Sequence, residues 1–286
     1  MAAGNAGFSV LEIAVALLIV AVLAVLAGAG WGSAKRKGAL MREIAAGKNL
    51  ITAYGLYELD HNGQFMRGMD WTQSQVWYEP SGKYLAMMHL ANRYPYRLAP
   101  YFNYEMEGTI LVNGNAAQIE KIAPKGQFMH EYVVSTFPAL GMNLNYVGGD
   151  YVQIGQVDAN GVKLGKYSWP NDVTTRRVQT RASLLVFASA ALGPESAKDS
   201  VTGYNILTPP YLTYASWSSK PWKKGADPSL YGNVDARYNG RAVCVFLDGS
   251  IQMLTIEELR DMRRWSRNAA ELDDPNYQIP DSIENY

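Results

Sequence analysis

The chain has 286 residues, of which 48% are hydrophobic and 18% charged, and its 26 basic residues balance 26 acidic ones. This composition allows a packed core in one large or two small domains and argues against a wholly disordered chain. The charge balance gives no sign of a nucleic-acid partner, which a basic excess would indicate, and the single cysteine, Cys244, excludes an intramolecular disulfide.

An apolar segment of membrane-spanning length opens the chain. Residues 13–29 contain no charge, and a helix over residues 8–31 would be about 36 Å long, enough to cross a hydrocarbon core of about 30 Å. Glu12, near the start of this segment, is the residue type that a spanning helix should exclude. Two interpretations leave it unexplained. One is a secretory signal peptide with its cleavage site at Ala27-Gly28-Ala29; the other is a plain single-span anchor with Glu12 at the membrane edge by accident.

A third interpretation accounts for the glutamate. The run Gly7-Phe8-Ser9-Val10-Leu11-Glu12, directly before the apolar stretch, resembles the processing site of type IV pilins and type II secretion pseudopilins. In that family a peptidase removes a short leader after a Gly, the new terminal residue is N-methylated, and a Glu lies four residues further along. The resemblance implies a leader of residues 1–7, cleavage after Gly7, methylation of Phe8 and a role in assembly for Glu12.

Basic residues bear on the topology. The leader MAAGNAG contains none, whereas Lys35-Arg36-Lys37 follows the apolar segment. The positive-inside rule alone would place the C-terminal body in the cytoplasm. The resemblance implies a single-pass inner-membrane precursor with its body in the periplasm.

Residues 32–60 are predicted to continue the helix, since no proline interrupts them. One face carries apolar residues at helical spacings, with a glycine among them: Leu40, Ile44, Gly47, Ile51 and Tyr54. The opposite face is charged: Arg42, Glu43 and Lys48. The cluster Asp60-His61-Asn62-Gly63 predicts the helix end, and residues 49–63 are similar to the helix end of the major pseudopilins. The alternative is two helices broken at the glycine-rich residues 28–32.

The rest of the chain shows recurring hairpin signals, because Asn-Gly and Asp-Gly supply the positive φ angles of tight turns. Such turns separate or follow apolar runs at residues 109–114, 151–164 and 242–254, and residues 183–188 form another apolar run. These patterns predict a mainly antiparallel sheet. Thr255 and Glu258 match a capping box, which opens a predicted helix to about Ala270 with a buried stripe of Leu259, Met262 and Trp265.

Two stretches of the body carry a second resemblance. Tyr238-Asn239-Gly240-Arg241, followed by an apolar strand and Asp248-Gly249, looks like the C-terminal signature of pilin-like proteins common in planctomycetes and verrucomicrobia. In that signature nine residues separate a His from Asp-Gly, and here Tyr238 stands at the His position, so a role specific to His does not carry over. The run Gly141-Met142-Asn143-Leu144-Asn145-Tyr146 resembles the same family's mid-chain segment.

No pattern indicates catalysis. The three histidines, His61, His89 and His130, lie far apart in the sequence without metal-ligand spacing, and Cys244 lies in an apolar run typical of a core strand. A Ca²⁺ ion is the one cofactor for which the sequence offers candidate ligands: Asp158, Asn160, Asp248, Asp273 and Asp274. Turn chemistry explains the first three without a metal, and we expect no cofactor.

These observations predict an α+β, pilin-like chain: a leader (1–7), a membrane-spanning assembly helix (8–31), its amphipathic continuation (32–60), a soluble, mainly β body with a C-terminal helix (61–272) and an irregular tail (273–286). The resemblance implies a non-enzymatic subunit that polymerises with copies of itself into a type II secretion pseudopilus. Its partners would be a prepilin peptidase, an inner-membrane assembly platform and minor pseudopilins. The alternatives are a type IV pilus pilin and a membrane-anchored, non-polymerising module that binds polysaccharide.

Overall fold

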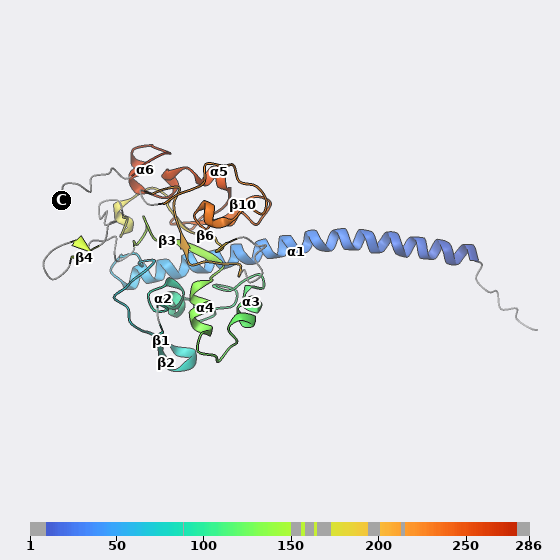
Figure 1. Ribbon diagram of the computed structural model, residues 1–286, viewed down its shortest axis with the longest axis horizontal. Helices are drawn as coiled ribbons and strands as arrows, with labels where there is room; N and C mark the ends of the chain where they lie inside the picture. The colour runs from blue at the N-terminus through green and yellow to red at the C-terminus, as the bar shows by residue number, and fades with distance from the viewer. Residues whose placement is uncertain are drawn as a thin grey trace, which may run out of the picture. The chain divides into compact units, whose positions relative to one another are not determined.

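The computed structural model describes residues 10–87, 89–149, 156–157, 163–164, 173–193, 201–212 and 215–278, with the backbone alone for residues 10–33, 156–157, 163–164 and 215. The chain divides into two compact units, residues 1–41 and 42–286. What is described of the first unit is helical, and every strand named below belongs to the second unit, which we call the body (Figure 1).

Helix α1 (Val10–Asp60) passes through residues 28–32 without a break, so the alternative of two helices is wrong. It ends where predicted, because Asn62 and Gly63 take positive φ angles of 55° and 76° and the Gly63 amide donates to the Glu58 carbonyl at 2.8 Å. Across the residues whose side chains are described, from Ala34 on, no helix is long and apolar enough to span a membrane. The predicted spanning segment lies outside them.

A five-stranded mixed sheet forms the centre of the body, in the strand order β11-β10-β6-β3-β7. Its strands are β3 (Leu140–Asn143), β6 (Leu185–Ser189), β7 (Ile206–Leu207), β10 (Arg241–Phe246) and β11 (Ile251–Thr255). Three of the four pairings are antiparallel, as predicted, but β3 and β7 pair in parallel. The fold class is therefore α+β, with a mixed sheet that is mainly antiparallel.

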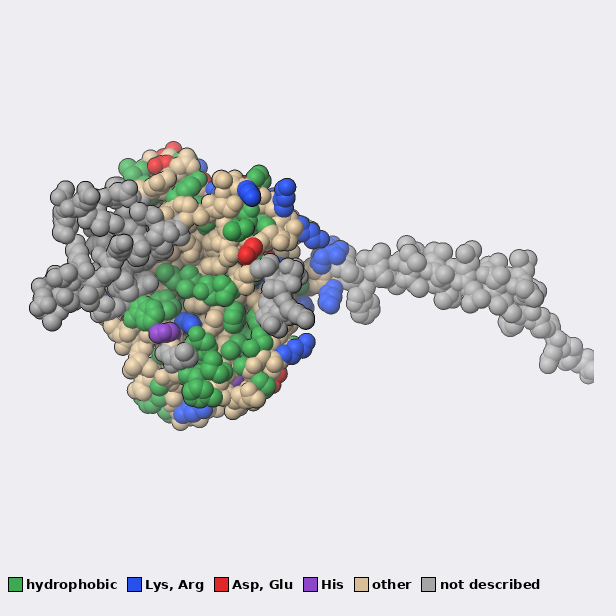
Figure 2. All heavy atoms as spheres, in the orientation of Figure 1, with side chains coloured by type: hydrophobic (Ala, Val, Ile, Leu, Met, Phe, Trp, Pro, Cys, Tyr) green, Lys and Arg blue, Asp and Glu red, His purple; other side chains and the backbone are tan. Residues whose placement is uncertain are grey.

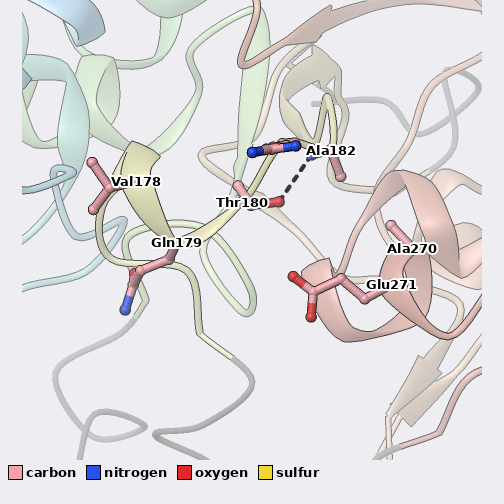
Figure 3. Close-up of a pocket in the computed structure, with 7 residues that line it drawn as sticks. Val178, Gln179, Thr180, Ala182, Ala270 and Glu271 are labelled. Atoms are coloured by element: carbon pink, nitrogen blue, oxygen red, sulfur yellow. Dashed lines mark hydrogen bonds between the residues drawn. The ribbon is translucent and has the colours of Figure 1, made fainter.

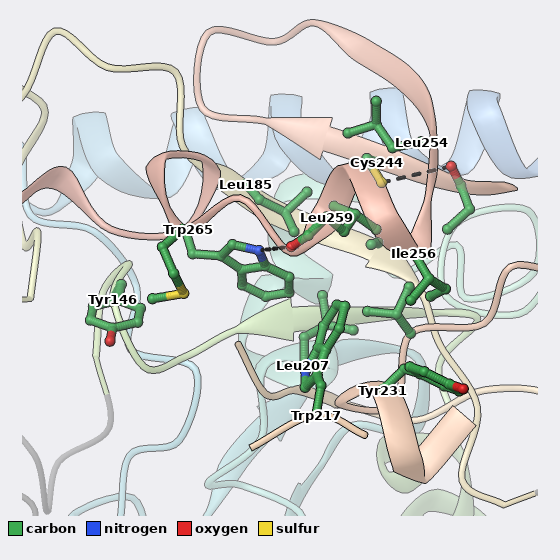
Figure 4. Close-up of a cluster of buried hydrophobic side chains, with 14 of the residues drawn as sticks. Tyr146, Leu185, Leu207, Trp217, Tyr231, Cys244, Leu254, Ile256, Leu259 and Trp265 are labelled. Atoms are coloured by element: carbon green, nitrogen blue, oxygen red, sulfur yellow. Dashed lines mark hydrogen bonds between the residues drawn. The ribbon is translucent and has the colours of Figure 1, made fainter. Parts of the chain in front are cut away.

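The two faces of the sheet are covered by different parts of the chain. Successive side chains of a strand point to opposite faces, and in β10 Val245 lies against Gly47 of α1 while Cys244 belongs to a cluster on the other face. Figure 4 shows that cluster, in which Trp265 Nε1 donates to the Leu259 carbonyl at 2.8 Å. Cys244 is completely buried there, so the prediction of a core cysteine is confirmed.

The remaining elements are short. Small antiparallel pairs are formed by β1 (Val76–Tyr78) with β2 (Lys83–Leu85), β4 (Gln156–Val157) with β5 (Lys163–Leu164), and β8 (Tyr211–Leu212) with β9 (Ala215–Ser216). The helices are α2 (Tyr94–Leu98), α3 (Asn115–Ile122), α4 (His130–Thr136), α5 (Ile256–Leu259) and α6 (Arg267–Glu271), and the 3-10 turns are η1 (Glu79–Ser81), η2 (Ala99–Phe102), η3 (Arg177–Gln179), η4 (Pro228–Tyr231) and η5 (Met262–Arg264). The predicted hairpin at Asn113-Gly114 is wrong, because that turn opens α3 instead of a returning strand.

The predicted C-terminal helix begins as expected but does not run through. Thr255 and Glu258 form the capping box of α5, and Leu259, Met262 and Trp265 are all completely buried. Asp261 and Ser266 then accept hydrogen bonds from the amides of Arg263 and Ala269, and each starts a new short turn. Since Asp and Ser side chains compete with the helix for backbone donors, the segment becomes α5, η5 and α6.

Candidate functional site

The signature residues Tyr238, Asn239 and Gly240 form a tight turn at the start of β10. Tyr238 and Arg241 exchange two backbone hydrogen bonds of 3.0 and 3.1 Å, and Asn239 and Gly240 have φ angles of 53° and 80°. Two central residues with positive φ define a type I′ turn, which Asn-Gly favours. A side chain on Gly240 would also lie 3.1 Å from the Trp222 ring. The turn therefore requires the Asn-Gly pair for its backbone and its packing.

The signature residues Asp248 and Gly249 form a different turn at the other end of β10. Gly249 has a φ of 83°, whereas the φ of Asp248 is not positive; the Gly249 amide donates to the Phe246 carbonyl at 2.9 Å, and the Phe246 amide donates to the Ser250 carbonyl at 2.9 Å. This is a type I turn closed by a glycine bulge, in which the positive φ predicted for an Asp-Gly turn falls on Gly249 alone. Although partial burial opposes it, the hydrogen bond from the Ser250 amide holds the pKa of the Asp248 carboxyl below its ordinary value.

The nine-residue spacing of the signature therefore corresponds to one strand with its two turns. Six residues of β10 alone extend over about 20 Å. The signature residues lie on one hairpin, but Tyr238 and Asp248 are at opposite ends of it and do not form a joint site.

Tyr238 contacts a residue that the sequence pattern placed wrongly. Glu43 was expected on the charged, outward face of α1, yet its side chain is completely buried. It lies one turn before Gly47, whose missing side chain lets α1 approach β10: an added Cβ would lie 2.7 Å from Val245 Cγ2. The stripe that faces the sheet thus includes Glu43. In the sequence, the four-residue spacing of Glu43 from Gly47 was the signal that could have placed Glu43 on the buried face.

Four residues from three segments of the chain surround the Glu43 carboxylate. The Tyr238 hydroxyl donates to Oε2 at 2.6 Å, Asn113 Nδ2 donates to the same oxygen at 3.3 Å, and the Ser189 hydroxyl donates to Oε1. Asn113 Nδ2 also lies 2.9 Å from the Tyr238 hydroxyl, which accepts from it. Arg237 Nη1 lies 3.6 Å from Oε2, so a positive charge accompanies the buried carboxylate.

The phenol of Tyr238 is held in the form that donates. Burial raises its pKa well above the ordinary value of a tyrosine, and the neighbouring Glu43 carboxylate raises it further. The Ser189 hydroxyl donates to Glu43 while it accepts from the Val243 amide at 2.9 Å. Since Glu43 and Ser189 are both completely buried, a substrate has no access to the carboxylate or to the serine hydroxyl, and these two side chains serve to join α1 to the sheet.

The other candidate residues do not converge on a site. His61 stacks on Tyr57, and His130 Nδ1 lies 2.7 Å from the Ala123 carbonyl. The histidine side chains on the face shown in Figure 2 lie well apart. Among the described residues, no group of three His, Cys, Asp or Glu side chains could hold a metal ion. Asp158 and Asn160 lie outside the described residues.

A shallow hollow lies beside η3 and α6 (Figure 3). It is lined by Val178, Gln179, Thr180, Arg181, Ala182, Ala270 and Glu271. The Thr180 hydroxyl accepts from the Ala182 amide at 3.0 Å, and Glu271 is the one acidic side chain in the lining. The hollow offers neither a nucleophile with a base nor a set of metal ligands.

Of the predicted processing and assembly residues, Gly7 and Phe8 lie outside the described residues, and Glu12 is described only through its backbone in α1. Comparison with protein-family models, with curated proteins and with solved structures finds no significant match for this chain.

Proposed function

We propose that this chain is a pilin-like structural subunit that is processed by a prepilin peptidase and polymerises through its N-terminal helix into a type II secretion pseudopilus. The run from Gly7 to Glu12, directly before the apolar stretch of the sequence, carries the proposal. A glutamate at this place has a purpose if cleavage after Gly7 produces a positive amine one helical turn away. A signal peptide or a plain anchor gives Glu12 no role.

The fold of the chain is a second observation that supports this proposal. A single helix of 51 residues whose second half lies on a sheet is a suitable subunit for a filament built around helices. In this proposal the chain is a single-pass inner-membrane precursor with its body in the periplasm. Its partners are other copies of itself, the prepilin peptidase, the assembly platform and minor pseudopilins. A type IV pilus pilin is the alternative within the same class.

The experiment that tests the proposal is the determination of the N-terminal residue of the mature chain. We expect mass spectrometry to find methylated Phe8 when the chain is expressed with its peptidase. Gly7→Leu should block cleavage, because a bulky side chain precedes the cut, whereas Gly4→Leu in the same leader should be processed normally. A mature chain that starts at Gly30 would support a signal peptide instead, and an intact Met1 would support a plain anchor.

One observation favours a second candidate, a membrane-anchored module that binds polysaccharide. Trp77 and Tyr84 are 41% and 58% exposed and form an edge-to-face pair, with ring centroids 5.1 Å apart, on the β1–β2 hairpin. Exposed aromatic rings are suited to stacking on sugars. Retention of the chain on a polysaccharide matrix, together with an absence of filaments, would favour this candidate over the first.

A further inference from the structure

Two polar anchors hold residues 42–60 of α1 on the rest of the body. The first is Glu43 with its donors, described above. At the second, Glu58 accepts from Arg177 Nη2 at 2.8 Å and from Arg177 Nε at 3.2 Å, and Arg177 Nη1 donates to the Leu247 carbonyl at 2.7 Å. Glu58 follows Glu43 by fifteen positions, which is about four helical turns. Between them the contacts are mainly apolar, and Leu50 and Tyr54 are completely buried.

The burial of large apolar side chains determines only in part where residues 42–60 of α1 lie along the sheet. Hydrophobic burial is non-directional, and the buried residues of α1 recur every three or four positions. A shift by one turn, about 5.4 Å, would therefore bring one apolar side chain close to the place of the next. The large apolar side chains thus discriminate weakly between these positions. Gly47 does discriminate, because a shift would place a larger residue where a Cβ would already lie 2.7 Å from Val245 Cγ2.

The Glu43 carboxylate discriminates strongly between the possible positions of α1 along the sheet. Its donors come from the turn before α3, from β6 and from the hairpin that opens β10: Asn113, Ser189 and Tyr238. These residues are far apart in the sequence, so no other position along the body offers the same set. Moving α1 by one turn would leave a buried carboxylate without its donors, which is among the most costly defects in a protein core.

We propose that Glu43 is a latch that, together with the close approach at Gly47, sets the register of residues 42–60 of α1 on the central sheet, and that the signature position occupied by Tyr238 donates the hydrogen bond that closes it. Residues 42–50 of α1 depend on this latch. Residues 51–60 are held separately by Glu58 and Arg177. The inference concerns the body alone and holds whether or not the chain forms filaments.

The test is a local one. Tyr238→Phe removes the hydroxyl and keeps the ring. In the full-length chain we expect it to speed the hydrogen exchange of backbone amides in residues 43–50 by roughly tenfold or more, and to leave residues 54–60 unchanged. Exchange followed by mass spectrometry resolves the two segments. Ser189→Ala, which removes a donor on a different strand, should give the same local pattern, so the test does not depend on one variant.

The matched control is the second anchor. Glu58→Gln should speed exchange in residues 54–60 and leave residues 43–50 unchanged. In a Glu43→Gln background, which removes the charged acceptor, Tyr238→Phe should have little further effect, because the two residues act as one unit. The proposal is overturned if Tyr238→Phe leaves the exchange rates of residues 43–50 unchanged, or if it speeds exchange equally throughout the body. It is also overturned if the full effect of Tyr238→Phe persists in the Glu43→Gln background.

Discussion

Cys244 is the single thiol of the chain, and it lies in the middle of β10 under the side chains of the core cluster. Burial raises its pKa to about 12. A raised pKa keeps the thiol protonated at neutral pH, and only the thiolate reacts readily. The fold therefore makes the Cys244 thiol unreactive at neutral pH.

This predicts slow labelling. At pH 7.5 a maleimide should modify Cys244 in the folded chain at least roughly a hundredfold more slowly than in the chain unfolded by urea. Mass spectrometry at successive times measures both rates. The two rates would be similar if Cys244 were accessible, and such a result would contradict its place in the core.

At the scale of elements, two glycines in α1 have opposite surroundings. A Cβ at Gly47 would lie 2.7 Å from Val245 Cγ2, whereas a Cβ at Gly55 would meet nothing within 4 Å. Gly55→Ala should stabilise the chain by about 0.5–1 kcal/mol through helix propensity. Gly47→Ala gains the same propensity but must push β10 away, an overpacking that typically costs about 1–3 kcal/mol. We expect urea denaturation to give opposite signs for the two variants. A stabilising Gly47→Ala would contradict the close approach.

The turn that links β10 to β11 gives a second test at this scale. Gly249 has a φ of 83°, a conformation that strains a β-branched residue by about 1–2 kcal/mol. Gly249→Val should lower the melting temperature of the full-length chain, and Gly249→Asn should lower it less, because Asn tolerates positive φ. Equal melting temperatures for the two variants would argue against a glycine bulge.

At the scale of the whole molecule, the proposed filament gives Glu12 its role. A carboxylate in hydrocarbon is penalised by roughly 3 kcal/mol on insertion scales. If cleavage after Gly7 leaves a positive amine on Phe8, Glu12 can pair with that amine or with the amine of an incoming subunit. Pairing offsets the penalty of burial, so the glutamate would align each new subunit as it enters.

Glu12→Ala should therefore leave cleavage and membrane insertion intact but abolish or slow filament growth, as seen by electron microscopy. Glu12→Asp, with its shorter reach, should be intermediate, and the neighbouring Ser9→Ala should assemble normally. Filaments of normal number and length from Glu12→Ala would remove the reason for assigning Glu12 to assembly.

The sequence by itself determined the features that depend on neighbouring residues. The continuity and end of α1, the capping box of α5, the strands β6, β10 and β11 and the glycine turn between β10 and β11 were all predictable. In each case the cause is local: a helical period, a side chain that caps a backbone amide, or a residue that tolerates positive φ. Where a local signal was ambiguous, as at Asn113-Gly114, the same turn opened a helix instead of a hairpin.

Only the tertiary structure decided the features that join distant segments. The parallel pairing of β3 with β7 and the burial of Glu43 are examples. The donors Asn113, Ser189 and Tyr238 lie 70, 146 and 195 residues from Glu43 in the sequence. A charged residue in a helical pattern indicates an outward face unless its partners are known. Those partners meet only when the sheet has formed, which is why the sequence predicted the helix but not the carboxylate that anchors it.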